Sequence, residues 1–253
     1  MISRGNQIEN RIIEKALNLG ASLAGIAVID DLKKSPSFEA YANKPFYESY
    51  EPDHPNYFKF EGFDWHEGHK SVLVWALEHP ESEPALDWWS MKVPGFTPGN
   101  RIMRRQSKQL RIWLQEEMGI EALSLPYQIE FGGTLLKDSA VLAGLGVFGK
   151  HNLLVTPQFG SRVRLRGIFM QAELEPTGPL NFDPCEGCGM PCHAVCPREA
   201  FRSGSFDRSL CKLENDQRDA DWEMLPGEIM GIEEESAVVK PCRFCELACP
   251  YGH

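Results

Sequence analysis

The chain has 253 residues, of which 42% are hydrophobic and 25% charged, and its formal net charge at pH 7 is −10. This balance is typical of a globular protein of one or two domains, and the acidic charge excludes the basic surface of a general nucleic-acid binder. The sequence shows neither a signal-peptide pattern nor an apolar run long enough to cross a bilayer, so we expect no membrane association and a cytoplasmic protein.

The first part of the chain predicts one helix and two buried strands. Apolar residues at helical spacing predict a helix over residues 6–19, and the apolar run at 22–29 predicts a strand. Residues 31–69 are rich in Pro, Asp and aromatic residues and predict loops with short helices. A second buried strand is predicted over residues 71–78.

The middle of the chain continues the mixture of helices and strands. Asn100 is the expected cap of a long amphipathic helix that ends near Met118. The elements predicted after it are a strand (121–127), a helix (134–144) and two strands (152–156 and 162–170). Because the order lacks the regular repeat of a doubly wound sheet, the predicted fold class is α+β. The composition changes at residues 176–179, which predicts two domains, 1–178 and 179–253.

All eight cysteines lie in the second predicted domain. Their order is Cys185-x2-Cys188-x3-Cys192-x3-Cys196-Pro197, then Cys211, then Cys242-x2-Cys245-x3-Cys249-Pro250. In a reducing compartment such clustering indicates metal binding rather than disulfides. Eight thiolates are the ligands that two [4Fe–4S] clusters require.

The Cys-Pro endings favour iron–sulfur clusters over zinc. In a two-cluster ferredoxin the cysteine before the proline binds the other cluster. We therefore hypothesise two ligand sets: Cys185, Cys188, Cys192 and Cys249 for one cluster, and Cys196, Cys211, Cys242 and Cys245 for the other. The sequence departs from the ferredoxin pattern by one extra residue between Cys188 and Cys192. Two tetrahedral zinc sites remain the alternative, because C-x2-C pairs also bind zinc.

Residues 143–152 form a glycine-rich segment that imitates two nucleotide-binding motifs. Gly144, Gly146 and Gly149 match G-x-G-x-x-G, but a predicted helix precedes the segment where a dinucleotide site needs a strand. His151 follows Lys150 where a phosphate loop needs Ser or Thr, so that motif is excluded as well. The glycines then indicate either close approach of the backbone to a ligand or to another element, or a plain turn that ends a helix.

This segment and the cysteines together resemble the epoxyqueuosine reductase family and the related corrinoid-dependent reductive dehalogenases. The residues that carry the resemblance are Ala143-Gly-Leu-Gly-Val-Phe-Gly-Lys150, Asn152-Leu-Leu-Val, Phe159-Gly-Ser161, Phe206-Asp-Arg-Ser-Leu-Cys211 and the cysteine pattern. The resemblance implies a nitroreductase-like domain that binds cobalamin in place of flavin, followed by a ferredoxin-like domain. It also implies that two [4Fe–4S] clusters pass electrons to cobalt, and that Co(I) then reduces the substrate by two electrons.

The resemblance also implies roles for single residues. Glu130 stands where the queuosine enzymes have an aspartate proton donor, 13 residues before Ala143, although an ordinary surface glutamate is the alternative. The residues implied to line the corrinoid are Gly144, Gly146, Gly149, Lys150, Asn152 and, through its phosphate or propionamides, Arg164. Arg162 and Arg166 share the strand face of Arg164, and a solvated basic face is the alternative for all three.

The function that follows is an oxidoreductase with iron–sulfur clusters and a corrinoid. The expected electron donor is a reduced ferredoxin or flavodoxin, and the substrate is left open. Tight binding of transfer RNA is not expected, because residues 181–253 alone carry a net charge of −7. The alternative is a non-catalytic iron–sulfur electron carrier that reduces the corrinoid or flavin of a partner, and a flavin in the chain's own N-terminal pocket also stays open.

Overall fold

The fold is described from a computed structural model, which covers residues 4–42, 47–48, 59–60, 62–127, 129 and 133–252. The chain forms two compact units, each built from separate stretches of sequence. Unit 1 comprises residues 1–76, 107–145 and 165–180, and unit 2 comprises residues 77–106, 146–164 and 181–253. None of the helices described in these stretches has the length and apolar character that crossing a membrane would require.

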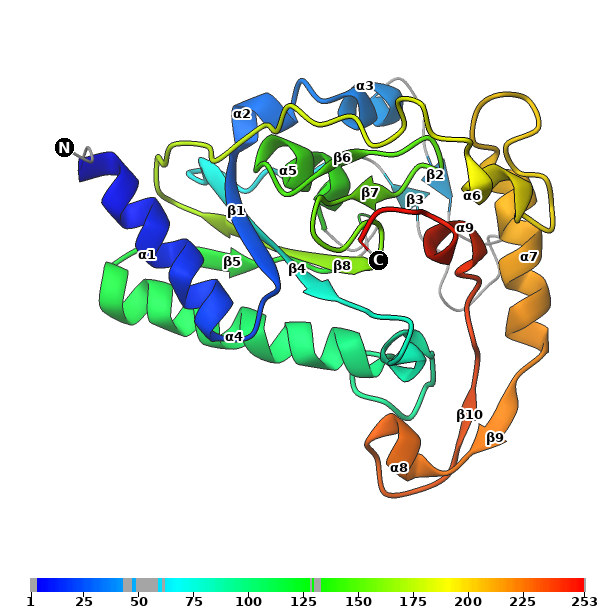
Figure 1. Cartoon of the computed structure of the whole chain (residues 1–253). Helices are drawn as coiled ribbons and strands as arrows, with labels where there is room; N and C mark the ends of the chain where they lie inside the picture. The colour runs from blue at the N-terminus through cyan, green and yellow to red at the C-terminus, as the bar shows by residue number, and fades with distance from the viewer. Residues whose placement is uncertain are drawn as a thin grey trace. The chain divides into compact units, whose positions relative to one another are not determined.

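The elements alternate between helix and strand for most of the chain (Figure 1). The helices are α1 (Arg4–Asn18), α2 (Ile29–Leu32), α3 (Pro36–Ala42), a 3-10 turn η1 (Pro84–Asp87), α4 (Pro98–Met118), α5 (Leu136–Leu142), α6 (Pro191–Ala194), α7 (Arg208–Ala220), α8 (Gly227–Met230) and α9 (Phe244–Leu247). The strands are β1 (Leu23–Val28), β2 (Tyr47–Glu48), β3 (Lys59–Phe60), β4 (Ser71–Glu78), β5 (Ala122–Ser124), β6 (Val147–Phe148), β7 (Leu154–Val155), β8 (Val163–Met170), β9 (Glu223–Leu225) and β10 (Ser236–Val238).

Unit 1 is organised around a four-stranded sheet in the order β1-β4-β8-β5. β1 pairs antiparallel with β4, placing Leu23 opposite Ala76, and β5 pairs antiparallel with β8. Figure 1 shows α1 and α4 on one face of this sheet and α5 on the other. Both faces are therefore covered, which explains why almost every residue of β4 and β8 is buried. The mixed α/β character predicted from the sequence is confirmed.

The segment after α5 approaches β1 closely at a single glycine. A Cβ atom on Gly25 would lie 2.6 Å from the Ala143 carbonyl oxygen and 2.8 Å from Oγ1 of Thr177. Thr177 links the same two backbone segments, since its hydroxyl donates to the Ala143 carbonyl at 2.7 Å and accepts from the Ile26 N–H at 2.9 Å. Only a residue without a side chain fits between these backbone segments.

We expect Gly25→Ala to destabilise the protein by about 1–3 kcal/mol, because the added methyl group must displace backbone atoms. The apparent thermal unfolding midpoint measures the effect. Gly167→Ala is the matched control: it lies on β8 in the same unit, but its added Cβ would come no closer than 3.3 Å, to a flexible Leu136 methyl group. Equal losses in both variants would contradict the close-packing argument.

Unit 2 carries every cysteine and two small sheets. β6 pairs with β7, and β9 pairs with β10, each antiparallel. A separate core forms where the β9–β10 sheet packs: Val93, Met230 and Val238 are buried, with Trp88 and Leu225 against them. In this core, residues 88–93, which follow η1, pack against residues 225–238, which lie between α7 and α9.

The long helix begins earlier than the sequence predicted. α4 starts at Pro98, and Thr97 provides the cap, because its hydroxyl accepts the Asn100 backbone N–H at 3.0 Å. The prediction that Asn100 is the cap was therefore wrong. The Asn100 amide instead donates to the Gly95 carbonyl at 2.6 Å. Proline at the first helical position is common, because its missing N–H needs no partner there.

Candidate functional site

The eight cysteines are free thiols held by short helices and turns of unit 2. Cys192 lies in α6, Cys211 in α7 and Cys245 in α9, and Cys192 and Cys249 are buried. The short helices arise where backbone N–H groups bond to carbonyls three or four residues back, as from Cys249 to Glu246. Most of the thiols therefore lie in or next to tight turns, and Cys211 lies in the longer helix α7.

The thiols affect one another in two sets of four. Burial raises the pKa of the Cys192 thiol, and the charges of Cys249, Cys185 and Cys188 raise it further. We name these four the first thiol group. Burial also raises the pKa of Cys211, to which Cys242 and Cys196 add.

Cys245 completes the second set. Burial and then the charges of Cys242 and Cys211 raise the pKa of its thiol to about 12. We name Cys196, Cys211, Cys242 and Cys245 the second thiol group. A weaker influence of Cys192 on Cys245 shows that the two groups are neighbours. The hypothesis that each set binds one cluster stays a prediction.

Backbone N–H groups point at sulfur atoms in both groups. The Lys150 N–H donates to Sγ of Cys185 at 3.4 Å, and the Ala200 N–H donates to Sγ of Cys196 at 3.3 Å. The Asn215 amide approaches Sγ of Cys211 at 3.9 Å. Such donors stabilise a thiolate over a thiol, and they tune the reduction potential when the sulfur binds iron.

The extra residue between Cys188 and Cys192 is absorbed by a left-handed turn. Met190 has φ 50° and ψ 52°, and Pro191 then starts α6. The left-handed region costs a non-glycine residue about 1–2 kcal/mol, so the turn is held by its surroundings. The turn brings Cys192 back beside Cys185 and Cys188 despite the longer spacing.

The glycine segment 143–152 has its glycines where backbones pack closely. Gly144, with φ 73°, follows α5 and ends that helix, which confirms the helix-stop interpretation at this residue. A Cβ on Gly146 would lie 2.3 Å from the Val155 carbonyl oxygen, across the β6–β7 hairpin. Phe148, Lys150 and Asn152 are exposed on that hairpin. An exposed hairpin thus adjoins the first thiol group through the Lys150 N–H.

A closed ring of four charged side chains, largely buried except for the 24% exposed Arg164, lies beside the second thiol group. Arg164 Nε contacts Asp87 Oδ1 at 2.7 Å, and its other nitrogen Nη2 donates to Glu246 Oε2 at 2.9 Å. Arg243 Nε donates to Glu246 Oε1 at 3.0 Å, and its Nη1 lies 3.1 Å from Asp87 Oδ2. Two carboxylates and two guanidinium groups therefore alternate around the ring, and their charges cancel.

His79 and the ring fix each other in place. Nδ1 of His79 lies 2.8 Å from Asp87 Oδ1, and the His79 carbonyl accepts from Arg243. Burial raises the pKa of Asp87, but the hydrogen bond from His79 and the positive charges of Arg164 and Arg243 together hold it below its usual value. Arg243 and Glu246 are sequence neighbours of Cys242 and Cys245, so the ring anchors the loop that carries both thiols.

The structure gives the predicted arginines partners within the chain. Arg164 bonds to Asp87 and Glu246 as described, Arg162 donates to the Tyr251 carbonyl at 2.8 Å, and Arg166 donates to the Leu125 carbonyl at 3.1 Å. Arg162 and Arg166 are buried, so the interpretation of a solvated basic strand face was wrong. The predicted contact of Arg164 with a corrinoid stays a prediction, as do the roles of the other predicted site residues. Glu130 lies outside the described residues.

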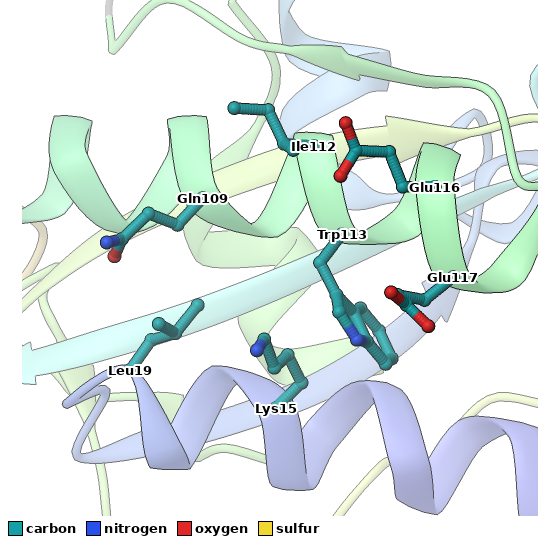
Figure 2. A pocket seen from close by; sticks show the side chains of 7 residues that line it. All are labelled: Lys15, Leu19, Gln109, Ile112, Trp113, Glu116 and Glu117. Carbon is teal, nitrogen blue, oxygen red and sulfur yellow. The ribbon is translucent and has the colours of Figure 1, made fainter.

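Unit 1 has a shallow hollow of about 250 Å³ between α1 and α4 (Figure 2). Its walls include Lys15 and Trp113, whose side chains point toward each other in Figure 2, with the ammonium 5.6 Å from the ring centre. Every lining residue belongs to unit 1, and every thiol belongs to unit 2. We therefore build the functional argument on the thiols and not on this hollow.

The sequence did not reveal Asp87, His79, Arg243 or Glu246 as parts of the site. Asp87 and His79 are separated from the cysteines by more than 90 residues and have no motif spacing. The one signal was that Arg243 and Glu246 lie directly next to predicted ligands. Among the residues that the structure covers, no three His, Cys, Asp or Glu side chains are arranged around a single metal-ion position.

Comparison with known sequences finds two groups of reductases. The chain is 26% identical to an epoxyqueuosine reductase of Leadbetterella byssophila over 253 residues, covering 94% of this chain and 77% of the relative. It is 30% identical to a tetrachloroethene reductive dehalogenase of Sulfurospirillum multivorans over 115 residues, covering 44% of this chain and 22% of the relative. No protein-family model matches.

Solved structures show the same two groups. An epoxyqueuosine reductase crystallised with a tRNA-Tyr epoxyqueuosine-modified stem loop superposes with a TM-score of 0.65 and 20% identity, over 98% of this chain and 66% of that one. A catabolic reductive dehalogenase in complex with 3-bromo-4-hydroxybenzoic acid gives a TM-score of 0.61 and 17% identity, over all of this chain and 33% of that one. The chain therefore shares their fold and spans less than two thirds of either solved protein.

Proposed function

We infer from the similarity to epoxyqueuosine reductases and reductive dehalogenases that the chain is an oxidoreductase, as the predicted resemblance implied. From this premise we propose that it is a corrinoid- and iron–sulfur-dependent reductase with two [4Fe–4S] clusters. The observation that carries the proposal is the division of eight thiols into two neighbouring sets of four.

In this proposal each thiol group holds one cluster. The first thiol group has the extra turn at Met190, and the second has the buried charge ring against it. The raised pKa values of Cys192, Cys211 and Cys245 mean that these thiols keep their protons until metal binds, so cluster assembly releases protons. Residues 179–253 then form the ferredoxin-like domain, and residues 1–178 the corrinoid-binding domain.

The corrinoid is proposed to lie beside the exposed β6–β7 hairpin. Phe148, Lys150 and Asn152 offer an aromatic ring, an ammonium group and an amide there, groups that suit a large ring with amide side arms. The Lys150 N–H adjoins Cys185, so this hairpin is next to the first thiol group. When bound, the corrinoid supplies the cobalt for a two-electron reduction. Gly144, Gly146 and Gly149 shape the segment, and Arg164 stays a proposed contact through its partly exposed side chain.

Glu130 is the proposed proton donor, and a reduced one-electron carrier protein is the proposed electron donor. A carboxylic acid can give a proton to a substrate, and Glu130 stands where the queuosine enzymes have an aspartate donor. The substrate class is a small molecule or nucleoside group that accepts two electrons and protons. The second candidate is a non-catalytic electron carrier, which the net charge of −7 on residues 181–253 favours.

The first experiment is metal analysis of protein purified without oxygen, incubated with cobalamin and desalted. We expect about eight irons and one cobalt per chain. Eight irons without cobalt would overturn the corrinoid part and support the carrier or a flavin-binding protein. Zinc in place of iron would overturn the proposal as a whole.

A further inference from the structure

More than half of the chain's net negative charge comes from one segment of unit 2. Residues 207–240, which we name the acidic lobe, carry ten acidic and four basic side chains, a net charge of −6 out of −10 for the chain. The lobe comprises α7, β9, α8 and β10. In Figure 1 these elements follow one another from gold to orange-red, with β9 and β10 side by side.

Three of the four basic residues of the acidic lobe pair with acids of the same lobe. Lys212 pairs with Asp216 at 2.6 Å, Arg218 with Glu214 at 2.9 Å, and Lys240 with Glu223. The carboxylates that remain at the surface are Asp219, Asp221, Glu228, Glu233 and Glu235, all exposed, together with Glu234, which pairs with Lys92. The lobe therefore presents a negative field rather than a balanced one.

Within this field lies an uncovered apolar face of the β9–β10 sheet. Met224 pairs with Ala237 across the sheet, and both are exposed. Trp222, two residues before Met224, is 55% exposed, and Met224 is 48% exposed. The opposite face is packed, because Leu225 and Val238 join the core of Val93 and Met230. An aromatic and a thioether side chain surrounded by charges is the composition of a docking patch.

Hydrogen bonds attach the acidic lobe to a neighbouring segment of unit 2. Trp89 and Val239 exchange two backbone hydrogen bonds of 2.9 Å, and the hydroxyl groups of Ser90 and Ser236 are hydrogen-bonded. Arg101 also donates to the Gly231 carbonyl at 2.8 Å. These contacts fix the lobe to residues 88–101 of the same unit, so a partner meets a preformed surface.

The lobe begins and ends at thiols of the second thiol group. Cys211 lies in the first turn of α7, and Cys242 follows the last residue of the lobe by two positions. Phe244, between Cys242 and Cys245, is 46% exposed, and the Arg218 guanidinium of α7 lies 5.1 Å from its ring centre. The acidic lobe is therefore joined at both ends to the segments that carry thiols of this group.

We propose that the acidic lobe is the docking surface for a redox protein with a basic face, and that electrons enter the chain at the second thiol group. The inference rests on the proposed function, because it needs a cluster at those thiols. The partner presents lysine and arginine side chains around its redox centre, and these side chains meet the carboxylates of the lobe. An apolar patch in the middle of the partner's interface covers Trp222 and Met224. Each encounter passes one electron between the partner's redox centre and the cluster, and no bond is made or broken.

The test uses ferricytochrome c, a basic one-electron acceptor, as the probe, since the same docking surface serves electron transfer in either direction. Anaerobic protein with its clusters is reduced with dithionite and desalted, and stopped-flow haem absorbance gives the second-order rate constant. One electron leaves a reduced cluster for each ferric haem. We expect the rate constant to fall about tenfold between low and physiological ionic strength, and to fall about tenfold at low salt in E228K/E233K/E235K.

The matched control is E116K/E117K/E121K, which makes the same charge change at three exposed glutamates of unit 1. We expect it to react within about twofold of the unaltered protein, and both variants to reduce a small neutral quinone at the unaltered rate. Equal slowing in both variants, or no slowing in either, would overturn the docking surface. If dithionite produces no bleaching of cluster absorbance, the proposed function itself is overturned, and this outcome is seen before any partner is added.

Discussion

Asp87→Asn is expected to lower the stability of the protein at pH 7 by about 3–5 kcal/mol, because it leaves the two guanidinium groups of the charge ring with a single carboxylate. In a protein of this size the apparent thermal midpoint should drop by about 10 °C. The measurement compares midpoints at matched iron content. The hydrogen-bonding shape of the side chain is largely kept, so the loss reports the missing charge between Arg164 and Arg243.

The pH dependence of this loss tests the ring separately. Because the pKa of Asp87 lies below its ordinary value of 3.8, the side chain contributes stability that is full above about pH 4 and is lost only as the pH falls further. The difference between Asp87→Asn and the unaltered protein should therefore stay constant from about pH 8 to about pH 5. A difference that shrinks in this interval would show that Asp87 is not held ionised by the ring.

Asp138→Asn is the control for the loss of a buried carboxylate in general. Asp138 is also buried, lies in unit 1, and accepts the Ser37 backbone N–H at 3.3 Å. We expect its replacement to cost about 1–2 kcal/mol, the effect of weakening a hydrogen bond. Equal losses at both positions would remove the case for a special role of the ring.

Cys245→Ser is expected to halve the iron content, from about eight to about four atoms per chain. Serine keeps the size of the side chain but removes the thiolate, and the second thiol group then has three sulfur ligands. The first thiol group has all four, so its cluster should persist. Anaerobic iron analysis measures the loss, and electron paramagnetic resonance of the reduced protein should lose the coupling between two neighbouring clusters.

Two companion variants decide whether the sets are assigned correctly. Cys185→Ser should also leave about four irons, but with the other cluster retained, so the spectra of the two single variants should differ. The double variant Cys185→Ser with Cys249→Ser should resemble Cys185→Ser, since both residues belong to one set. A loss of all iron in that double variant would place Cys249 in the second set and contradict the grouping.

The elements that the sequence predicted best are those set by local apolar patterns. The strand at 71–78 matches β4, and the helix at 6–19 differs from α1 by two residues at its start and one at its end. The expected strand at 121–127 shrinks to Ala122–Ser124, because Leu125 pairs only through its backbone N–H with Gly167. The pairing of distant strands, such as β4 beside β8, depends on tertiary packing that no local pattern encodes.

The candidate site also has one part that the sequence predicted and one part that it did not. The proposed grouping of the thiols came from the pattern of two-cluster ferredoxins, in which the cysteine before the proline binds the other cluster. The charge ring did not follow from the sequence, because its members come from η1, β8 and α9 and meet only in the folded chain. Arg164 was singled out as a basic residue, yet its carboxylate partners could be identified only from distances.

The charge ring also affects whether the cysteine-rich segment, residues 179–253, could be transferred to another protein. A chain cut between residues 178 and 179 would keep Arg243 and Glu246 but lose Asp87 and Arg164, the residues that surround them. The excised fragment would have to leave the Cys242–Cys245 loop without its inner support, or expose that loop to water. Grafting this segment onto another protein would therefore require grafting residues 77–106 and 146–164 as well. The compact unit that holds the thiols is built from three separate stretches of chain and not from one contiguous segment.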